Sequence, residues 1–501
     1  MPDAYEKFLS LVKDLNRLTA AEGLLGWDRE TYMPPKASPA RAEQLAALSG
    51  LIHRRLVSDE MGDLLAELEE NPPGGFEDYA SATNIREVRR VRDRKVKIPE
   101  SLVRELAETA SLAMVVWARA RETDDFPSFA PHLEKLVKLK RQEADAVGYA
   151  GERYDALLDE YEPDTTTEEV VGIFEPLRDA LVELVGRIGD SPRRPDLSLL
   201  HRPCLLDKQV AICRQVATDM GFDFDAGRID IAPHPFCSGT LHDVRITTRY
   251  DVNCLPMALF GTIHEAGHGL YEQGLDPAHA WTPMAETVSL GIHESQSHLW
   301  ESFVARSREF WAFYLERIQR CFAPVLDDVS LPGWYAAINH VAPSLIRVDA
   351  DEVTYNLHIV LRFKMERALL DGDLAVAEVP QIWREYMRDD LGIEPPNDRD
   401  GCLQDIHWSH GAFGYFPTYT LGILYAGQFY AAAKKALGDL PDQIARGDLR
   451  PLRNWLRENI HRHGQRYRAG ELVERVTGQP LSAQPFVDYL HEKFGQLYDL
   501  K

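Results

Sequence analysis

The sequence has little of what is typical of secreted, membrane-spanning or nucleic-acid-binding proteins. It has six cysteines in 501 residues and no Cys-x-x-Cys pair, so we expect free thiols in a reducing compartment. The first fifteen residues lack a basic stretch followed by an apolar core, and no run of eighteen apolar residues occurs. We therefore expect no signal peptide, no transmembrane helix and a cytoplasmic location.

Basic residues are scarce relative to acidic ones. Lysine and arginine together number 56 against 79 aspartates and glutamates, which gives a formal net charge of −23 with histidine neutral. Because nucleic acids and anionic membranes attract cationic surfaces, this balance argues against both as partners. Hydrophobic residues make up 45 % of the chain, enough for a sizeable core. The length allows about three ordinary domains or one large one.

Most of the chain has the apolar spacing of amphipathic helices. Steps of three and four predict helices over residues 5–26 and 40–70, the first of which should end near Gly26. Thr166 followed three residues later by Glu169 is a capping box and predicts the start of another helix. The proline-punctuated segment 191–196 is the best linker candidate in the first half.

A dense basic cluster lies between Arg86 and Lys97. We interpret it as the solvated face of a helix, with Ile85, Val88 and Val91 turned inward, because runs of charge are usually surface. The alternative is an anion-binding strip.

One segment follows a period of two instead. Alternate residues from Val244 to Tyr250 are apolar or β-branched, which predicts a small β-element within residues 229–250. Helical patterns then resume, apart from a loop-rich interval over residues 392–422. The fold class that this pattern predicts is mainly α.

A candidate metal site follows the β-element. In His264-Glu265-Ala266-Gly267-His268, two imidazoles leave one face of a helix and can bind a zinc ion, while Glu265 can act as general base. Gly267 and Gly269 weaken a helix, which suggests that backbone or substrate approaches closely there. The alternative is a solvent-facing helical turn without metal.

A catalytic zinc needs a third protein ligand and one open position for water. The helical pattern over residues 288–300 offers three candidates, His293, Glu294 and His298. Spacing alone does not choose among them.

Further motifs carry a resemblance to a known family. With these motifs in this order, the chain resembles the carboxypeptidase Taq family of zinc metallocarboxypeptidases over essentially its whole length. The motifs are His234-Pro235-Phe236, Asp243-x-Arg245-x-Thr247, His264-Glu265-x-x-His268, His293-Glu294-Ser295-Gln296, Ile346-Arg347-x-x-Ala350-Asp351 and Gly401-x-x-Gln404-Asp405-x-His407-Trp408.

The resemblance implies a fold, an activity and a site. Residues 1–501 would form one catalytic domain, a large helical metallopeptidase with two lobes flanking a deep substrate groove and a small β-sheet beside the active site. The metal ligands would be His264, His268 and Glu294, with Glu265 as the catalytic base. The expected cofactor is Zn²⁺, for which Co²⁺ or Mn²⁺ are possible substitutes. The enzyme would be a homodimer that removes single C-terminal residues from peptides with broad specificity.

A carboxypeptidase must also recognise a free C-terminal carboxylate, and arginine pairs with it bidentately. Arg347 is our first choice, and its alternative role is an ion pair with Asp349 or Asp351. Arg245 is a second candidate, although it is also placed to form a structural ion pair.

The reaction further needs a donor to the developing oxyanion. The interval from Asp405 to Tyr419 offers four candidates, namely His407, His410, Tyr415 and Tyr419. The resemblance favours His407 and Tyr419 as catalytic residues, and His234 for substrate positioning. The alternative for each is a hydrogen-bonded core residue.

Two other functions are compatible with the motifs. One is an oligopeptidase or dipeptidyl carboxypeptidase on the same helical fold. The other is a helical binding protein without catalytic activity, in which the zinc only joins two helices. Structural zinc sites usually have four protein ligands, whereas this sequence offers three convincing ones, which argues against that function.

Overall fold

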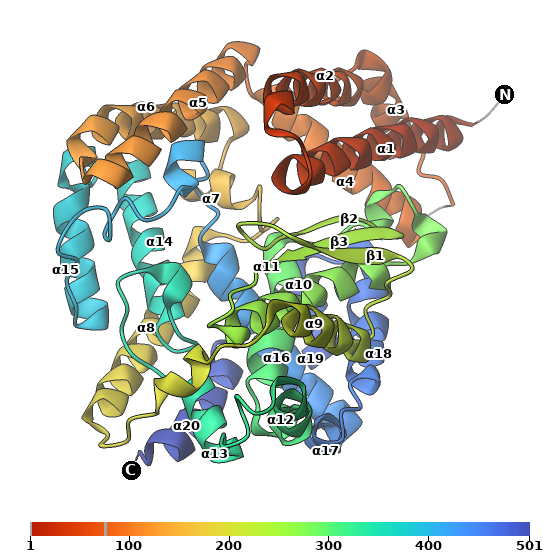
Figure 1. The fold of residues 1–501 in the computed structure, drawn as a ribbon. Helices are drawn as coiled ribbons and strands as arrows, with labels where there is room; N and C mark the ends of the chain where they lie inside the picture. Colours follow the sequence, from red (N-terminus) through yellow and green to blue (C-terminus); the bar gives the residue numbers. More distant parts are fainter. Residues whose placement is uncertain (1–2, 75–77, 501) are drawn as a thin grey trace.

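The computed structural model describes residues 3–74 and 78–500, and it consists mostly of helices around a small sheet (Figure 1). The described residues contain no helix with the length and hydropathy needed to cross a bilayer. The elements before the sheet are α1 (Ala4–Thr31), α2 (Ser38–Leu56), α3 (Asp59–Glu70), α4 (Tyr79–Lys97), α5 (Glu100–Thr123), α6 (Phe126–Val147), α7 (Arg153–Leu158), α8 (Thr167–Asp190) and α9 (Leu206–Met220).

The sheet is followed by a second series of helices, as the mainly α prediction requires. The strands are β1 (Gly227–Ile231), β2 (Cys237–Thr240) and β3 (Asp243–Thr248). The later helices are α10 (Leu255–Gly274), α11 (Leu290–His298), the π-helical turn Leu299–Ala305, α12 (Arg308–Phe322), α13 (Leu331–Ile338), α14 (Tyr355–Asp371), α15 (Val379–Leu391), α16 (Pro417–Leu437), α17 (Leu440–Ala445), α18 (Arg450–Asn459), α19 (Ala469–Thr477) and α20 (Gln484–Tyr498). Short 3₁₀ turns lie at Pro35–Ala37, Leu197–His201, Pro277–His279, Pro283–Ala285, Arg347–Asp349, Val376–Glu378, His407–His410 and His461–Arg466.

Several predicted boundaries move. Helix α1 does not end near Gly26 but continues to Thr31, because a glycine with open space around it is tolerated inside a helix. Residues 40–70 form two helices, not one, since Ser58 caps α3 by accepting a hydrogen bond from the backbone of Met61. The capping box at Thr166 is confirmed as the start of α8.

The basic cluster on α4 is less solvated than predicted. Ile85 and Val88 are buried as expected, but Val91 is exposed. Arg94 is itself buried and pairs with Glu143 on α6 at 3.0 Å. This cluster therefore connects α4 to neighbouring helices.

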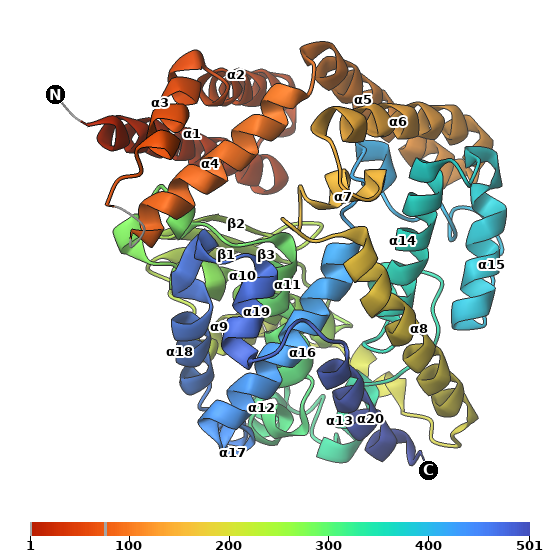
Figure 2. The ribbon, with the colours of Figure 1, turned by 180° about the vertical axis from the view of Figure 1, so that it is seen from behind.

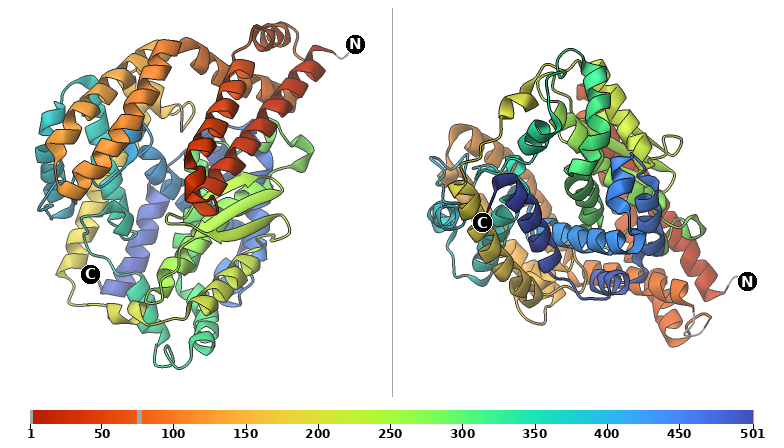
Figure 3. Two further views of the ribbon diagram at one scale, coloured as in Figure 1. Left: turned by 45° about the horizontal axis from the view of Figure 1, so that its top comes forward. Right: turned by 90° about the horizontal axis from the view of Figure 1, so that it is seen from below.

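The β-element is confirmed as a three-stranded sheet in the order β1-β3-β2, with β1 parallel and β2 antiparallel to β3. Val244 and Ile246 are buried, and the Thr248 hydroxyl lies 3.3 Å from the carbonyl of Ala258 on α10. Helix α1 lies against the other side of the sheet, as Figures 1 and 3 show. The sheet therefore separates the N-terminal helices from α10.

The buried hydrophobic residues form two clusters. The larger one extends from Ala113 on α5 to Tyr498 on α20. The smaller one belongs to α1, α3 and α4, which lie together at one end of the molecule (Figure 2). The predicted linker at 191–196 is short and tied down, since the Ser191 hydroxyl donates to the carbonyl of Tyr498 at 2.6 Å.

The loop-rich interval ends earlier than residue 422, because α16 begins at Pro417. Proline is suited to the first turn of a helix, where its missing N–H has no intrahelical partner. Gly422 lies inside α16, where a larger residue would not fit. A Cβ at this position would lie 2.7 Å from the Cβ of Glu294 on α11. Helices α16 and α11 therefore approach each other closely at this point.

Candidate metal centre and active site

Helix α10 carries the His-Glu-x-x-His segment through the interior. Glu265 and His268 are buried, and His264 is partly exposed. The predicted close approach of backbone is confirmed at Gly267, whereas Gly269 packs against a side chain. A Cβ on Gly267 would lie 2.6 Å from the carbonyl oxygen of Gln296 on α11, and one on Gly269 would meet the ring of Phe222 at 2.6 Å.

Three side chains from α10 and α11 converge, namely His264, His268 and Glu294. The His268 Nε2 lies 3.3 Å from one Glu294 oxygen, and the His264 Nε2 lies 3.9 Å from the other. One ligand atom from each residue lies within 4.8 Å of the other two. Two imidazoles and a carboxylate at this separation form a donor set that suits a catalytic zinc.

Outer hydrogen bonds orient both imidazoles. The His264 Nδ1 lies 2.9 Å from Glu301, and the His268 Nδ1 lies 3.0 Å from the carbonyl of His293. Metal-binding histidines usually donate their second N–H to such an acceptor, which leaves Nε2 free for the metal. Both Nε2 atoms point toward Glu294, as this arrangement requires.

Glu301 is a functional candidate that the sequence analysis missed. It lies in the π-helical turn Leu299–Ala305 and pairs with Arg306 at 3.0 Å as well as with His264. Its separation of seven residues from Glu294, two helical turns, was the available signal. His264, His298 and Glu301 form a second group of possible ligands, but the Glu301 contact uses the Nδ1 of His264.

The structure distinguishes the three candidates for the third ligand. His293 stacks on His268 with ring centroids 4.3 Å apart, and its Nε2 contacts Glu272 at 3.1 Å. His298 lies beside the carboxylate of Glu294 at 3.0 Å. Only Glu294 contacts both histidines of the His-Glu-x-x-His segment among these three.

Glu265 has the environment expected of a base. Burial raises the pKa of its carboxyl to about 7. Its Oε2 is buried and has no hydrogen-bond partner among the described residues. Because such an oxygen is costly to leave unpaired, it is a natural acceptor for a water or substrate proton.

A buried carboxylate anchors the start of α11. Glu162 accepts from the Ser289 hydroxyl at 2.9 Å, the Gly291 backbone at 3.0 Å and the Tyr425 hydroxyl at 3.1 Å. Burial raises the pKa of Glu162 to about 7. This anchor fixes the helix that carries Glu294, and the sequence analysis did not identify it.

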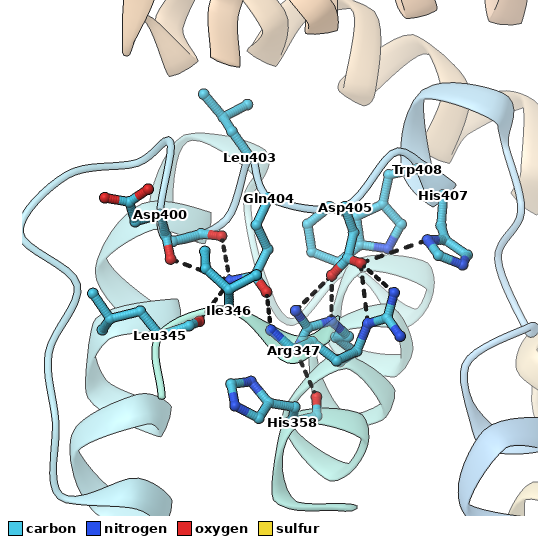
Figure 4. A network of polar contacts seen from close by, with 12 residues as sticks. Leu345, Ile346, Arg347, His358, Asp400, Leu403, Gln404, Asp405, His407 and Trp408 are labelled. Atoms are coloured by element: carbon cyan, nitrogen blue, oxygen red, sulfur yellow. Dashed lines mark hydrogen bonds and ion pairs between the residues drawn. The ribbon is translucent and has the colours of Figure 1, made fainter. Parts of the chain in front are cut away.

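Arg347 occupies a second polar cluster, which Figure 4 shows with Asp405 and His407. The guanidinium is buried and lies 2.7 Å from the Asp405 Oδ1, while Arg362 contacts the Oδ2 at 2.6 Å. Despite burial, Arg362 and Arg347 hold the pKa of Asp405 well below its usual range. The alternative pairing of Arg347 with Asp349 or Asp351 is therefore wrong: its partner lies far along the chain.

His407 and Tyr419 meet beside Arg347. The His407 Nε2 lies 3.3 Å from the Tyr419 hydroxyl, and the Arg347 guanidinium lies 5.1 Å from the Tyr419 ring centroid. Burial lowers the pKa of His407 to about 4. Tyr415 packs against Tyr419, whereas His410 is exposed. Tyr419 lies in the first turn of α16 and not in a loop, because α16 begins at Pro417.

Tyr355 connects the two clusters. Its hydroxyl accepts from Arg347 at 3.1 Å, and its ring lies 6.2 Å from that of Tyr419 and 6.3 Å from that of His298. Since His298 contacts Glu294, Tyr355 and His298 together link the Arg347 cluster to the candidate metal ligands.

His234 and Arg245 lie on the sheet side of the site. Arg245 pairs with Asp243 at 2.8 Å and covers the Trp27 ring at 4.2 Å, so the structure places it in the structural ion pair considered as its alternative role. His234 is exposed in the β1–β2 loop. Its neighbour Pro235 lies 3.9 Å from the Cβ position of Gly261, about one turn before His264 on α10.

Comparison with known proteins decides the family. The family model described as carboxypeptidase Taq (M32) metallopeptidase matches residues 7–494. The chain belongs to the M32 metallopeptidase family. It is 43 % identical over 505 residues to thermostable carboxypeptidase 1 of Thermus thermophilus, which covers 99 % of both chains. It is 38 % identical over 500 residues to carboxypeptidase 1 of Bacillus subtilis, again over 99 % of each.

Solved structures agree with this M32 assignment. The crystal structure of an M32 carboxypeptidase from Deinococcus radiodurans superimposes with a TM-score of 0.96 at 40 % identity, over 99 % of both chains. The chain is therefore a peptidase of the metallocarboxypeptidase type, a hydrolase that acts on peptides.

Proposed function

We propose that this M32 peptidase is a zinc-dependent carboxypeptidase that releases single residues from the C-terminus of peptides with broad side-chain tolerance. The observation that carries the proposal is the convergence of His264, His268 and Glu294 beside the unpartnered carboxylate oxygen of Glu265. These three residues would hold the metal. When bound, zinc polarises the scissile carbonyl and lowers the pKa of a water molecule.

Glu265 would move the protons. Its Oε2 accepts a proton from the attacking water and then delivers it to the leaving amine. A buried carboxylate with an unpaired oxygen is suited to both steps, because it can take a proton from water and pass it to an amine. The unpaired state of this oxygen supports the assignment, since no other residue competes for it among the described residues.

Arg347 would bind the free C-terminal carboxylate. Its guanidinium donates to the Tyr355 hydroxyl, and the Tyr355 ring lies 6.3 Å from that of His298, which contacts Glu294. The scissile bond would then lie between Arg347 and the metal ligands. The carboxyl end of a peptide is thereby held against the cluster, and one residue can be released per cycle. This arrangement favours a carboxypeptidase over an oligopeptidase or dipeptidyl carboxypeptidase.

The remaining candidates would assist. Tyr419 would donate a hydrogen bond from its hydroxyl to the oxyanion, and the contact with His407 at 3.3 Å would hold the phenol in place. His234 would position the peptide from the β1–β2 loop. Arg245 would support the site by joining the sheet to Trp27 of α1.

Four further expectations, from the resemblance and the composition, are also proposals. We propose one catalytic domain over residues 1–501 that assembles as a homodimer, and sedimentation analysis of the purified protein would test the assembly. We also propose that the enzyme works in the cytoplasm. Zinc is the preferred ion, while Co²⁺ and Mn²⁺ fit the same donor set.

The decisive experiment replaces Glu265 by Gln and measures turnover of a blocked dipeptide together with zinc content. We expect E265Q to bind zinc and to lose at least a hundredfold in kcat, since general base catalysis contributes about 10²–10⁴-fold. E316Q, on the exposed face of α12, is the control and should keep full activity. Full turnover by zinc-loaded E265Q would contradict the mechanism.

A second measurement separates the alternative activities. A five-residue peptide with a free C-terminus should yield a ladder of products that lose one residue at a time. Release of dipeptides or internal cleavage would instead indicate a dipeptidyl carboxypeptidase or an oligopeptidase. Removal of the metal by a chelator should abolish activity and leave the fold intact. If the zinc only joined two helices, its removal would instead unfold the protein.

A further inference from the structure

The Arg347 cluster contains more positive than negative charge. Arg347 and Arg362 share one carboxylate, that of Asp405, and each arginine occupies a different oxygen of it. The two nearest histidines do not change this balance, because burial lowers the pKa of both His358 and His407. The cluster therefore has one positive charge in excess at neutral pH.

The phenols around the cluster are neutral as well. Burial raises the pKa of Tyr355 to about 12 and also raises that of Tyr419 well above its usual value. A buried excess charge is expensive unless an anion pairs with it. The cluster is thus prepared for an anionic ligand, which in the proposed function is the C-terminal carboxylate of the peptide.

Arg362 has no access to that ligand. Its side chain has 0 % exposure, its guanidinium lies 4.6 Å from the Trp383 ring centroid, and it donates to the carbonyl of His358 at 2.8 Å. Arg347 in contrast lies 5.1 Å from the Tyr419 ring centroid and donates to Tyr355, whose ring lies 6.3 Å from that of His298 beside the metal ligands. The two arginines therefore differ in role although both bind Asp405.

We propose that Arg362 is a positioning residue that makes the site select a free carboxylate. By pairing with Asp405, Arg362 compensates the charge of this carboxylate and leaves that of Arg347 available to the substrate. Without Arg362, Asp405 would neutralise Arg347 and repel a carboxylate. Asp405 in turn holds the Arg347 side chain through contacts with Nε and Nη2 at 3.1 and 2.7 Å. This inference rests on the proposed function.

The test compares two peptides that differ only at the C-terminus, one a free carboxylate and the other a carboxamide. For the wild type we expect a strong preference for the carboxylate in kcat/KM. In R362M the preference should fall by about 10- to 100-fold, mainly through KM for the free carboxylate, because charge-assisted hydrogen bonds contribute on this scale. Zinc content and the melting temperature are measured in parallel.

The double variant R362M/D405N separates charge balance from a general structural defect. It removes one positive and one negative charge, and asparagine keeps the Oδ1 that accepts from both Nε and Nη2 of Arg347. One excess positive charge therefore remains on a held side chain, and the preference should return. R362K, which also keeps the charge, should retain it. R94M is the matched control, since Arg94 is a buried arginine paired with Glu143 and Glu160 outside the cluster, and it should leave the preference unchanged.

The outcomes are distinguishable. Failure of the wild type to release single residues from the free peptide would overturn the proposed function itself. An active wild type with undiminished preference in folded R362M would overturn only the role of Arg362. If R362M alone does not fold, R362K and R362M/D405N decide: retention of the preference in both supports the charge balance, and its loss in either refutes it.

Discussion

Replacement of Gly267 by alanine tests whether the helix crossing sets the metal-binding geometry. The added Cβ would lie 2.6 Å from the carbonyl oxygen of Gln296 and 2.8 Å from the Cα of Ser297, both backbone atoms of α11. Ordinary van der Waals contact begins at 3.4 Å, so α10 and α11 would have to separate by several tenths of an ångström. His268 adjoins the substitution on one helix, and Glu294 lies two residues from Gln296 on the other.

The expected effect on stability is a loss of up to about 2 kcal/mol, and the effect on metal affinity is large. Alanine gains about 1 kcal/mol of helix propensity over glycine, while overpacking costs about 1–3 kcal/mol. These contributions partly cancel in the free energy of unfolding. Metal–ligand distances, in contrast, tolerate about ±0.2 Å, less than the expected helix displacement. We therefore expect the zinc affinity of G267A to fall at least tenfold.

The assay is a zinc competition titration with a chromophoric chelator, combined with thermal melting of the metal-free protein. The control is G23A on α1, where no atom lies within 4 Å of the new Cβ, and it should gain up to about 1 kcal/mol without a change in zinc affinity. A folded G267A with wild-type zinc affinity would refute the argument that close packing of α10 on α11 sets the ligand distances.

Two further predictions concern residues behind the site. E301Q should bind zinc about 10- to 100-fold more weakly in the same titration, because Glu301 orients the His264 ring, and unchanged affinity would exclude that role. E366Q tests a pH effect. Burial raises the pKa of Glu366 to about 7, so at intermediate pH the folded state keeps a proton that the unfolded state has lost. The contribution of Glu366 to stability should therefore fall as the pH rises from about 5 to 8, by an amount on the order of 3 kcal/mol. In denaturant unfolding, the free energy of unfolding of E366Q should lack this decrease with pH. Equal pH dependence in E366Q and the wild type would contradict the prediction.

Local patterns predicted the elements well and their boundaries less well. The capping box at Thr166 and the alternation after Asp243 rest on neighbouring residues, and both are confirmed. The end of α1 and the start of α16 were wrong by several residues, because the helix was expected to end near Gly26 and the loop-rich interval to continue to residue 422. Gly422 is required by contact with Glu294, a tertiary cause that periodicity does not reveal.

The site also contains residues that local patterns predict and residues that only tertiary contacts identify. His264 and His268 share one helical face, so local geometry was enough to pair them, whereas the choice of Glu294 needed the resemblance. The carboxylates that support the site are different. Glu162 reaches α11 from more than a hundred residues away, and its role depends on contacts made only after folding. Nothing in the spacing of the chain pointed to it.

The net charge of the molecule, like its local sequence patterns, does not reveal the charge at the site. A net charge of −23 predicts an outer surface that repels anions, yet the proposed substrate ends in a carboxylate. The conflict disappears because the Arg347 cluster is buried, where screening is weak and two arginines against Asp405 leave a local excess of positive charge. In this proposal, selection of the substrate depends on the charge balance of Arg347, Arg362 and Asp405 inside the protein. The 135 charged residues counted in the sequence do not reveal that local balance.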